Sequence, residues 1–98
     1  MLVHSVYFWL TDDISSKDRQ MFKQKLEALK KVDSAEAVYV GTPAETDRPA
    51  IDRSYDYALT LIFKDIEAHD TYQTDPLHKD FLHSCSKFFD NVVIYDAK

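Results

Sequence analysis

The sequence predicts an α+β fold of the ferredoxin-like, split-βαβ kind, in which helices pack on one face of a four-stranded antiparallel sheet. Two observations lead to this class. The predicted elements follow one another as strand, helix, strand, strand, short helix, helix and strand. In addition, the opening strand is apolar on both faces, as expected of a sheet that is covered on both sides.

The first strand is predicted over residues 2–10, where β-branched and aromatic residues dominate. Because successive side chains of a strand point to opposite faces, one face carries His4, Val6, Phe8 and Leu10. The other face carries Val3, Ser5, Tyr7 and Trp9. A strand covered on one side only would be polar at every second position, so two buried faces are indicated.

The first helix is predicted from about Ser15 to Val32. Ser15 or Ser16 can cap it, and Asp18 follows Ser15 by three residues in a capping-box-like position. The apolar stripe is narrow and consists of Phe22, Leu26, Leu29 and Val32, with Met21 beside it. Lys and Gln fill the outer side, so only one side of this helix should be covered.

Two strands and an exposed connection are predicted for the middle of the chain. The second strand, over about residues 35–40, ends at Gly41, the only glycine, where a positive φ is expected. Residues 42–53 carry two of the three prolines and five charges, which favours a solvent-exposed connection. The third strand, Tyr55 to Phe63, should place its odd-numbered residues, Tyr55 included, on one face.

A short helix, a longer amphipathic helix and a final strand complete the predicted fold. Asp65 can cap the short helix, and Asp75-Pro76 marks the start of the next, since Pro suits the first helical position. Apolar residues then recur at helical spacing, at Leu77, Phe81, Leu82, Cys85, Phe88 and Phe89. The final strand is expected over Val92 to Tyr95.

Composition and charge exclude several classes of protein. A chain of 98 residues with 45% hydrophobic and 30% charged residues fits one globular domain over 1–98. The net charge of −5 and the scattered Lys and Arg residues argue against a nucleic-acid partner. No apolar run approaches the roughly 20 residues that span a bilayer, so no membrane association is expected. One cysteine and a strand-like N-terminus predict a cytoplasmic protein.

The second face of the sheet predicts a homodimer. Tyr7 and Trp9 would leave an apolar patch in water that is larger than monomers usually tolerate. Pairing sheet to sheet with a second copy would bury it.

The four histidines are the first candidates for metal or acid–base chemistry. His78 and His83 are five residues apart in a helix and point about 140° away from each other, and no HExxH or Cys/His cluster exists. We therefore expect no metal and no cofactor, and interpret His69 and His83 as surface residues. Cys85 lies roughly 10 Å from His78 along the helix, too far for thiol activation, so it is interpreted as a core residue.

Tyr72 and His78 leave two interpretations open. Both side chains could point under the helices towards His4, Val6 and Phe8, where an imidazole and a phenol can move a proton at a carbonyl-containing ligand. Alternatively, Tyr72 packs its ring and His78 hydrogen-bonds the backbone at a helix N-terminus.

Several of these segments together resemble the stress-responsive dimeric α/β-barrel (Dabb) family. The matching features are His4-x-Val6-x-Phe8, Tyr57-Ala-Leu-Thr-Leu-Ile-Phe63, Asp65-x-Glu67-Ala68, Tyr72-x-x-x-Pro76-x-His78 with Phe81, and Val93-Ile94-Tyr95-Asp96. The resemblance implies a homodimeric barrel of two facing sheets, with a cavity between each sheet and its helices. It also implies the candidate ligand-pocket residues His4, Val6, Phe8, Phe22, Leu26, Leu59, Phe81, Phe89 and Ile94.

The resemblance implies more than one function. In plant polyketide cyclases of the olivetolic acid cyclase type, the tyrosine and histidine that match Tyr72 and His78 form the catalytic acid–base pair. The first hypothesis is a dimeric barrel that binds a small apolar or carbonyl-containing ligand without chemistry. The second is an acid–base cyclase or lyase that acts on a polyketide-like substrate, with His78 as base and Tyr72 as donor. A third, a haem- or quinol-oxidising monooxygenase, has no haem-ligand context around the histidines.

Overall fold

The computed structural model describes residues 1–98 and contains four strands and three α-helices. They follow in the order β1 (Leu2–Leu10), α1 (Ser16–Ala28), β2 (Ala37–Gly41), β3 (Tyr57–Phe63), α2 (Ile66–Gln73), α3 (Pro76–Cys85) and β4 (Phe89–Ala97). Short 3₁₀ turns, Leu29–Lys31 and Ser86–Phe88, extend α1 and α3. This order confirms the predicted α+β class.

The four strands form one antiparallel sheet in the order β2-β3-β1-β4. In the register of this sheet, Val6 of β1 lies opposite Leu59 of β3 on one side and Ile94 of β4 on the other. β1 is therefore central, and its side chains decide what each face of the sheet presents.

Side-chain caps fix where the three helices begin, as predicted. The Ser15 hydroxyl accepts a hydrogen bond from the Asp18 amide at 3.0 Å. The Asp65 carboxylate accepts one from the Ala68 amide at 2.9 Å. Asp75 caps α3 through the Leu77 amide at 2.8 Å, with Pro76 at the first helical position. Such caps contribute about 1 kcal/mol each.

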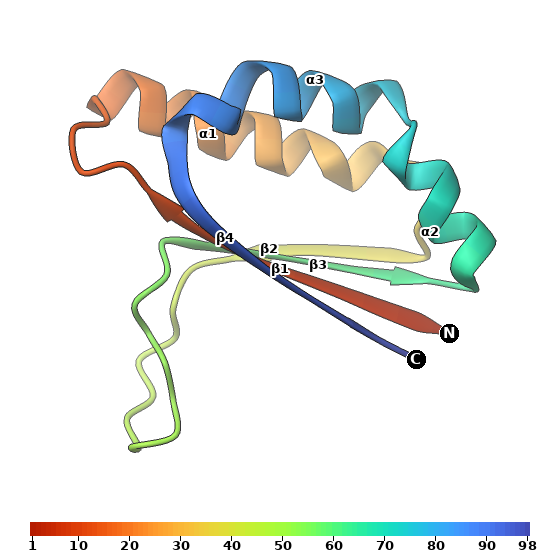
Figure 1. Ribbon diagram of the computed structural model, residues 1–98, viewed down its shortest axis with the longest axis horizontal. Helices are drawn as coiled ribbons and strands as arrows, with labels where there is room; N and C mark the ends of the chain where they lie inside the picture. Colours follow the sequence, from red (N-terminus) through yellow and green to blue (C-terminus); the bar gives the residue numbers. More distant parts are fainter.

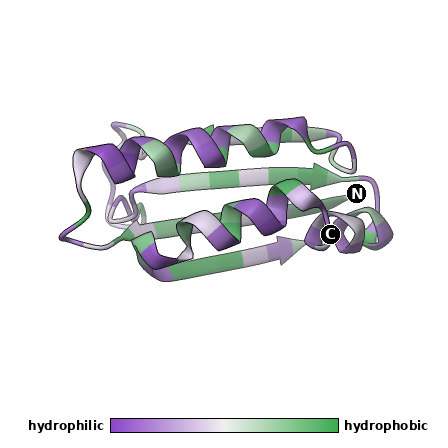
Figure 2. Cartoon of the chain, turned by 90° about the horizontal axis from the view of Figure 1, so that it is seen from above, coloured by the Kyte–Doolittle hydropathy of each residue, from purple (hydrophilic) through white to green (hydrophobic).

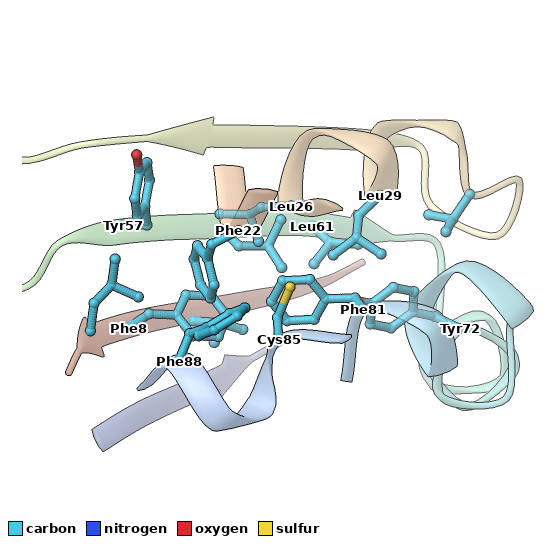
Figure 3. Packing of buried hydrophobic residues seen from close by; sticks show 14 of the residues in the cluster. Phe8, Phe22, Leu26, Leu29, Tyr57, Leu61, Tyr72, Phe81, Cys85 and Phe88 are labelled. Carbon is cyan, nitrogen blue, oxygen red and sulfur yellow. The ribbon is translucent and has the colours of Figure 1, made fainter. Parts of the chain in front are cut away.

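The hydrophobic core lies between the helices and one face of the sheet (Figure 3). Phe22, Leu26 and Leu29 enter it from the helical layer and are fully buried. Figure 2 shows that the outer sides of α1 and α3 are largely hydrophilic. The helices thus cover the sheet with one apolar side each.

No helix covers the other face of the sheet (Figure 1). Tyr7 and Trp9 of β1 are only half-buried there, and Tyr39 and Tyr95 on the outer strands are 69% and 66% exposed. The connection between β2 and β3 projects from this side. We call this surface the open face.

Three details differ from the sequence expectations. Gly41 ends β2 without a positive φ, and a Cβ there would lie 3.0 Å from the exposed ring of Tyr39, which would have to shift slightly. β3 begins at Tyr57, and Tyr55 turns to the open face, where its ring lies 5.0 Å from that of Tyr7.

The third difference is at the C-terminal end of α3. Phe88 and Phe89 lie beyond the α-helix, and Leu82 is 42% exposed rather than buried with its neighbours.

Candidate functional site

A cavity of about 120 Å³ lies between the sheet and the helical layer. Its walls come from β1, β3, β4, α3 and the C-terminal end of α2. The lining residues are His4, Val6, Phe8, Leu59, Tyr72, Gln73, His78, Phe81, Leu82, Phe89, Val92 and Ile94. The wall is mostly apolar, so the few polar groups that face the cavity determine its chemistry.

Tyr72 and His78 meet across the junction of α2 and α3. Asp75 caps α3 immediately after α2 ends, which places His78 in the first turn of α3 beside the last turn of α2. The two rings have centroids 4.5 Å apart. Tyr72 is almost completely buried and packs on Phe63.

One ring nitrogen of His78 is fixed by the backbone. Its Nδ1 lies 3.2 Å from the Gln73 carbonyl oxygen. Because a carbonyl only accepts, Nδ1 carries the hydrogen, and in the neutral ring Nε2 is left with a free lone pair. His78 therefore makes the backbone hydrogen bond that one of the two interpretations of the sequence predicts. The same bond fixes the ring in the tautomer that a base requires.

Burial favours the neutral form of both rings, the unprotonated imidazole of His78 and the protonated phenol of Tyr72. Burial lowers the pKa of His78 below its ordinary value of 6.5, which favours the neutral imidazole. Burial, with the nearby Asp75 carboxylate as the smaller cause, raises the pKa of Tyr72 far above its ordinary value of 10. The cavity therefore offers a proton acceptor beside a proton donor at neutral pH.

His4 is the only buried polar residue of the chain, with 5% of its surface exposed. Its Nδ1 lies 2.5 Å from an Asp96 carboxylate oxygen, as expected from the β1–β4 register, which places the two residues opposite each other. His4 also lies edge-on to Tyr72 and lines the cavity. This hydrogen bond offsets the cost of burying an imidazole.

His69 is not the surface residue expected from the sequence. Its side chain is only 16% exposed, and its ring lies 5.1 Å from that of His4 and 5.6 Å from that of Phe63. The signal that could have shown this is its spacing from Tyr72, three positions along α2, which puts both on one side of the helix. His83 is exposed, as predicted.

Seven of the nine candidate pocket residues line the cavity, and two do not. Phe22 and Leu26 are fully buried in the core between α1 and the sheet, outside the cavity. The cavity lies under α3 instead, because α3 rather than α1 faces β4. Residues that the sequence did not suggest are Gln73, Leu82 and Val92.

Cys85 is a core residue, as predicted. It is fully buried, and burial raises the pKa of its thiol to about 11, so little thiolate forms at neutral pH.

A second hollow, of about 400 Å³, lies on the open face. Tyr7, Trp9, Asp52, Tyr55, Val93 and Tyr95 line it.

The sheet order and the helices on one face define a ferredoxin-like fold, and this protein has a cavity between its sheet and helices. The family model of the stress responsive A/B barrel domain (Dabb) matches residues 2–98, so the chain belongs to this family. No curated protein matches it.

Solved structures with the same fold include three informative ones. A dimeric ferredoxin-like protein of unknown function from Thermobifida fusca superposes with a TM-score of 0.79 at 16% identity, covering 98% of this chain and 88% of the other. A Dabb family protein from Mesorhizobium loti superposes with a TM-score of 0.78 at 19% identity, and the match covers 99% of this chain and 94% of the other. Hydroxynitrile lyase from Passiflora edulis superposes with a TM-score of 0.78 at 14% identity, and the match covers 98% of this chain and 90% of the other.

None of the helices combines the length and the apolarity that crossing a membrane requires.

The His78 ring provides the first prediction. Its NMR titration midpoint should lie below 6.5, because burial lowers the pKa of the ring. His4 and His69 lower this pKa further. The Gln73 carbonyl and the Asp75 charge raise it, but by less than burial lowers it. Acidification through this range should destabilise the fold, since the unfolded chain then binds more protons. The Leu82→Ala variant removes an apolar side chain from the cavity wall, one turn along α3 from His78. Because this exposes His78 to more water, the midpoint should move back towards 6.5. A wild-type midpoint at or above 6.5 would contradict this picture of the site.

Proposed function

We propose that the chain forms a homodimer and binds a small carbonyl-containing ligand in the cavity beside Tyr72 and His78. The observation that carries this proposal is the convergence of a buried phenol and an imidazole at the edge of a mostly apolar cavity. A carbonyl oxygen accepts a hydrogen bond from the phenol, while the carbon skeleton contacts Val6, Phe8 and Phe81.

The size of the cavity limits the ligand. At about 120 Å³ it is smaller than the roughly 300–1,000 Å³ of sites for drug-sized molecules. Val92 and Ile94 line the cavity yet are 38% and 51% exposed, so its mouth lies at β4. A compact group fits inside, and a longer substituent would extend through this mouth.

The open face supports the dimeric part of the proposal. Tyr7, Trp9 and Val93 form an aromatic and aliphatic surface that no helix covers and that Tyr55 and its neighbours in the β2–β3 connection contact. Structural neighbours such as the Thermobifida fusca protein are described as dimeric. A second copy placed on this face would bury the apolar surface of both chains.

Acetophenone is a suitable probe, because ethylbenzene provides a control of similar size without the oxygen. Amide chemical shifts around Gln73, His78 and Val92 should move on titration with acetophenone and much less with ethylbenzene. The Val92→Trp variant, which fills the mouth, should weaken binding at least tenfold, whereas Lys79→Trp on the exposed side of α3 should not. Equal responses to both probes, or shifts confined to the open face, would refute a carbonyl site.

Acid–base catalysis is a second candidate function, favoured by the complementary protonation states of the pair. The Nε2 atom of His78 would take a proton from the carbon beside the carbonyl, and the Tyr72 hydroxyl would hydrogen-bond the enolate oxygen that forms. The resulting enolate is the nucleophile that an aldol-type cyclisation needs. A lyase that cleaves a cyanohydrin would use the same pair on its hydroxyl proton.

Deuterium exchange at the methyl group of acetophenone in D₂O tests this chemistry without a natural substrate. General acid–base catalysis contributes about 10²–10⁴-fold, so wild-type protein should accelerate exchange measurably over buffer. His78→Gln and Tyr72→Phe should each lower the rate at least tenfold, while His83→Gln on the same helix should retain it. Exchange that persists in the His78→Gln variant would eliminate the catalytic role and leave the binding proposal standing.

The dimer is tested at Trp9. A Trp9→Glu substitution would bury an unpaired carboxylate in the interface, at a cost of several kcal/mol, and should convert dimer to monomer at micromolar concentration. The control is Gln24→Glu, which adds the same charge on the exposed side of α1. Light scattering after size exclusion gives both masses. A Trp9→Glu protein that remains dimeric would show that the open face is not the interface.

A further inference from the structure

Three potential metal ligands converge at the end of the sheet where both chain termini and α2 lie (Figure 1). They are His4 from β1, His69 from α2 and Asp96 from β4. One ligand atom from each lies within 4.8 Å of the other two. Residues so distant in sequence meet only because β1 pairs with β4 and α2 packs over this end of the sheet.

From this arrangement we propose that His4, His69 and Asp96 bind a divalent transition-metal ion of the Zn²⁺ class. Two imidazoles and one carboxylate are a donor set that Zn²⁺ and Co²⁺ favour, whereas Mg²⁺ and Ca²⁺ prefer oxygen alone. The ion takes the place of the hydrogen between His4 Nδ1 and Asp96, and in the neutral imidazole that hydrogen moves to Nε2. Protons compete with the metal for ligand atoms, so binding should weaken at acidic pH.

The neighbours of His69 prepare it as a ligand. Its Nδ1 lies 3.1 Å from the Asp70 carboxylate, which accepts the hydrogen, and its Nε2 lies 3.3 Å from the amide nitrogen of Gln73. Nε2 therefore carries a lone pair, and a carboxylate orients the ring from behind, an arrangement typical of metal-binding histidines. At His69, a metal bound through Nε2 would replace only the 3.3 Å contact with Gln73.

The geometry requires small movements. Tetrahedral zinc holds its ligand atoms about 3.4 Å apart, given metal–ligand distances of roughly 2.0–2.2 Å. The His4 and Asp96 atoms, now 2.5 Å apart, must separate by about 1 Å, and His69 must approach by a similar amount. His69 is partly exposed on a two-turn helix and Asp96 is 43% exposed, so both side chains can adjust and an ion can enter from solvent.

Three protein ligands leave a fourth position for water or another ligand. His4 lines the cavity, so an ion bound to it lies next to the space beside Tyr72. The metal site does not depend on the proposed carbonyl binding, because neither Tyr72 nor His78 is among its ligands.

The direct test is titration of untagged, EDTA-treated protein with Co²⁺ and then Zn²⁺. One Co²⁺ per chain should bind with the visible absorption of a tetrahedral site containing nitrogen ligands, and Zn²⁺ should displace it. Zn²⁺ should also raise the melting temperature. The absence of stoichiometric binding by both ions at neutral pH would overturn the proposal.

Variants separate this site from other binding. His69→Ala, at a partly exposed position that the fold should tolerate, and Asp96→Asn should each weaken Zn²⁺ binding at least tenfold. His83→Ala, which removes the exposed histidine of α3, should leave it unchanged. If His69→Ala binds like wild type while circular dichroism shows it folded, the ligand assignment is wrong.

Discussion

The central position of β1 is the constraint on which the rest of the structure depends. This strand pairs with β3 on one side and β4 on the other, and it is apolar on both faces. Val6 and Phe8 on one face supply the floor of the core and the cavity. Tyr7 and Trp9 on the other face stay half-buried because no helix covers them, and the proposed dimer would bury them.

The polar residues of the site follow from the same strand. His4 occupies a core-facing position at which burial of an unpaired imidazole would be unfavourable, so it depends on Asp96 across the β1–β4 ladder. The Dabb family match and the fold neighbours establish the architecture but leave the ligand open. The proposals for what the chain does with that architecture therefore rest on Tyr72, His78 and the cluster around His4.

Local signals in the sequence predicted the fold well, while the details of the site depended on tertiary packing. The caps at Ser15 and Asp75 and the two-residue period of β1 are properties of short segments, and all are confirmed. The spacing of His69 from Tyr72 indicates that both lie on one side of α2, but the contact of His69 with His4 depends on how α2 packs against β1. The family resemblance implies Phe22 as a pocket residue, but nothing in the sequence shows whether α1 or α3 borders an opening.

The most direct test of the account is whether the open faces of two chains meet. Isotope-filtered NMR on a mixture of labelled and unlabelled protein detects contacts between chains only. If the open faces meet, intermolecular NOEs should arise from the Tyr7 and Trp9 rings and from Val93, in particles of twice the 11.4 kDa chain mass. A monomer, or intermolecular NOEs confined to the outer sides of α1 and α3, would contradict this account.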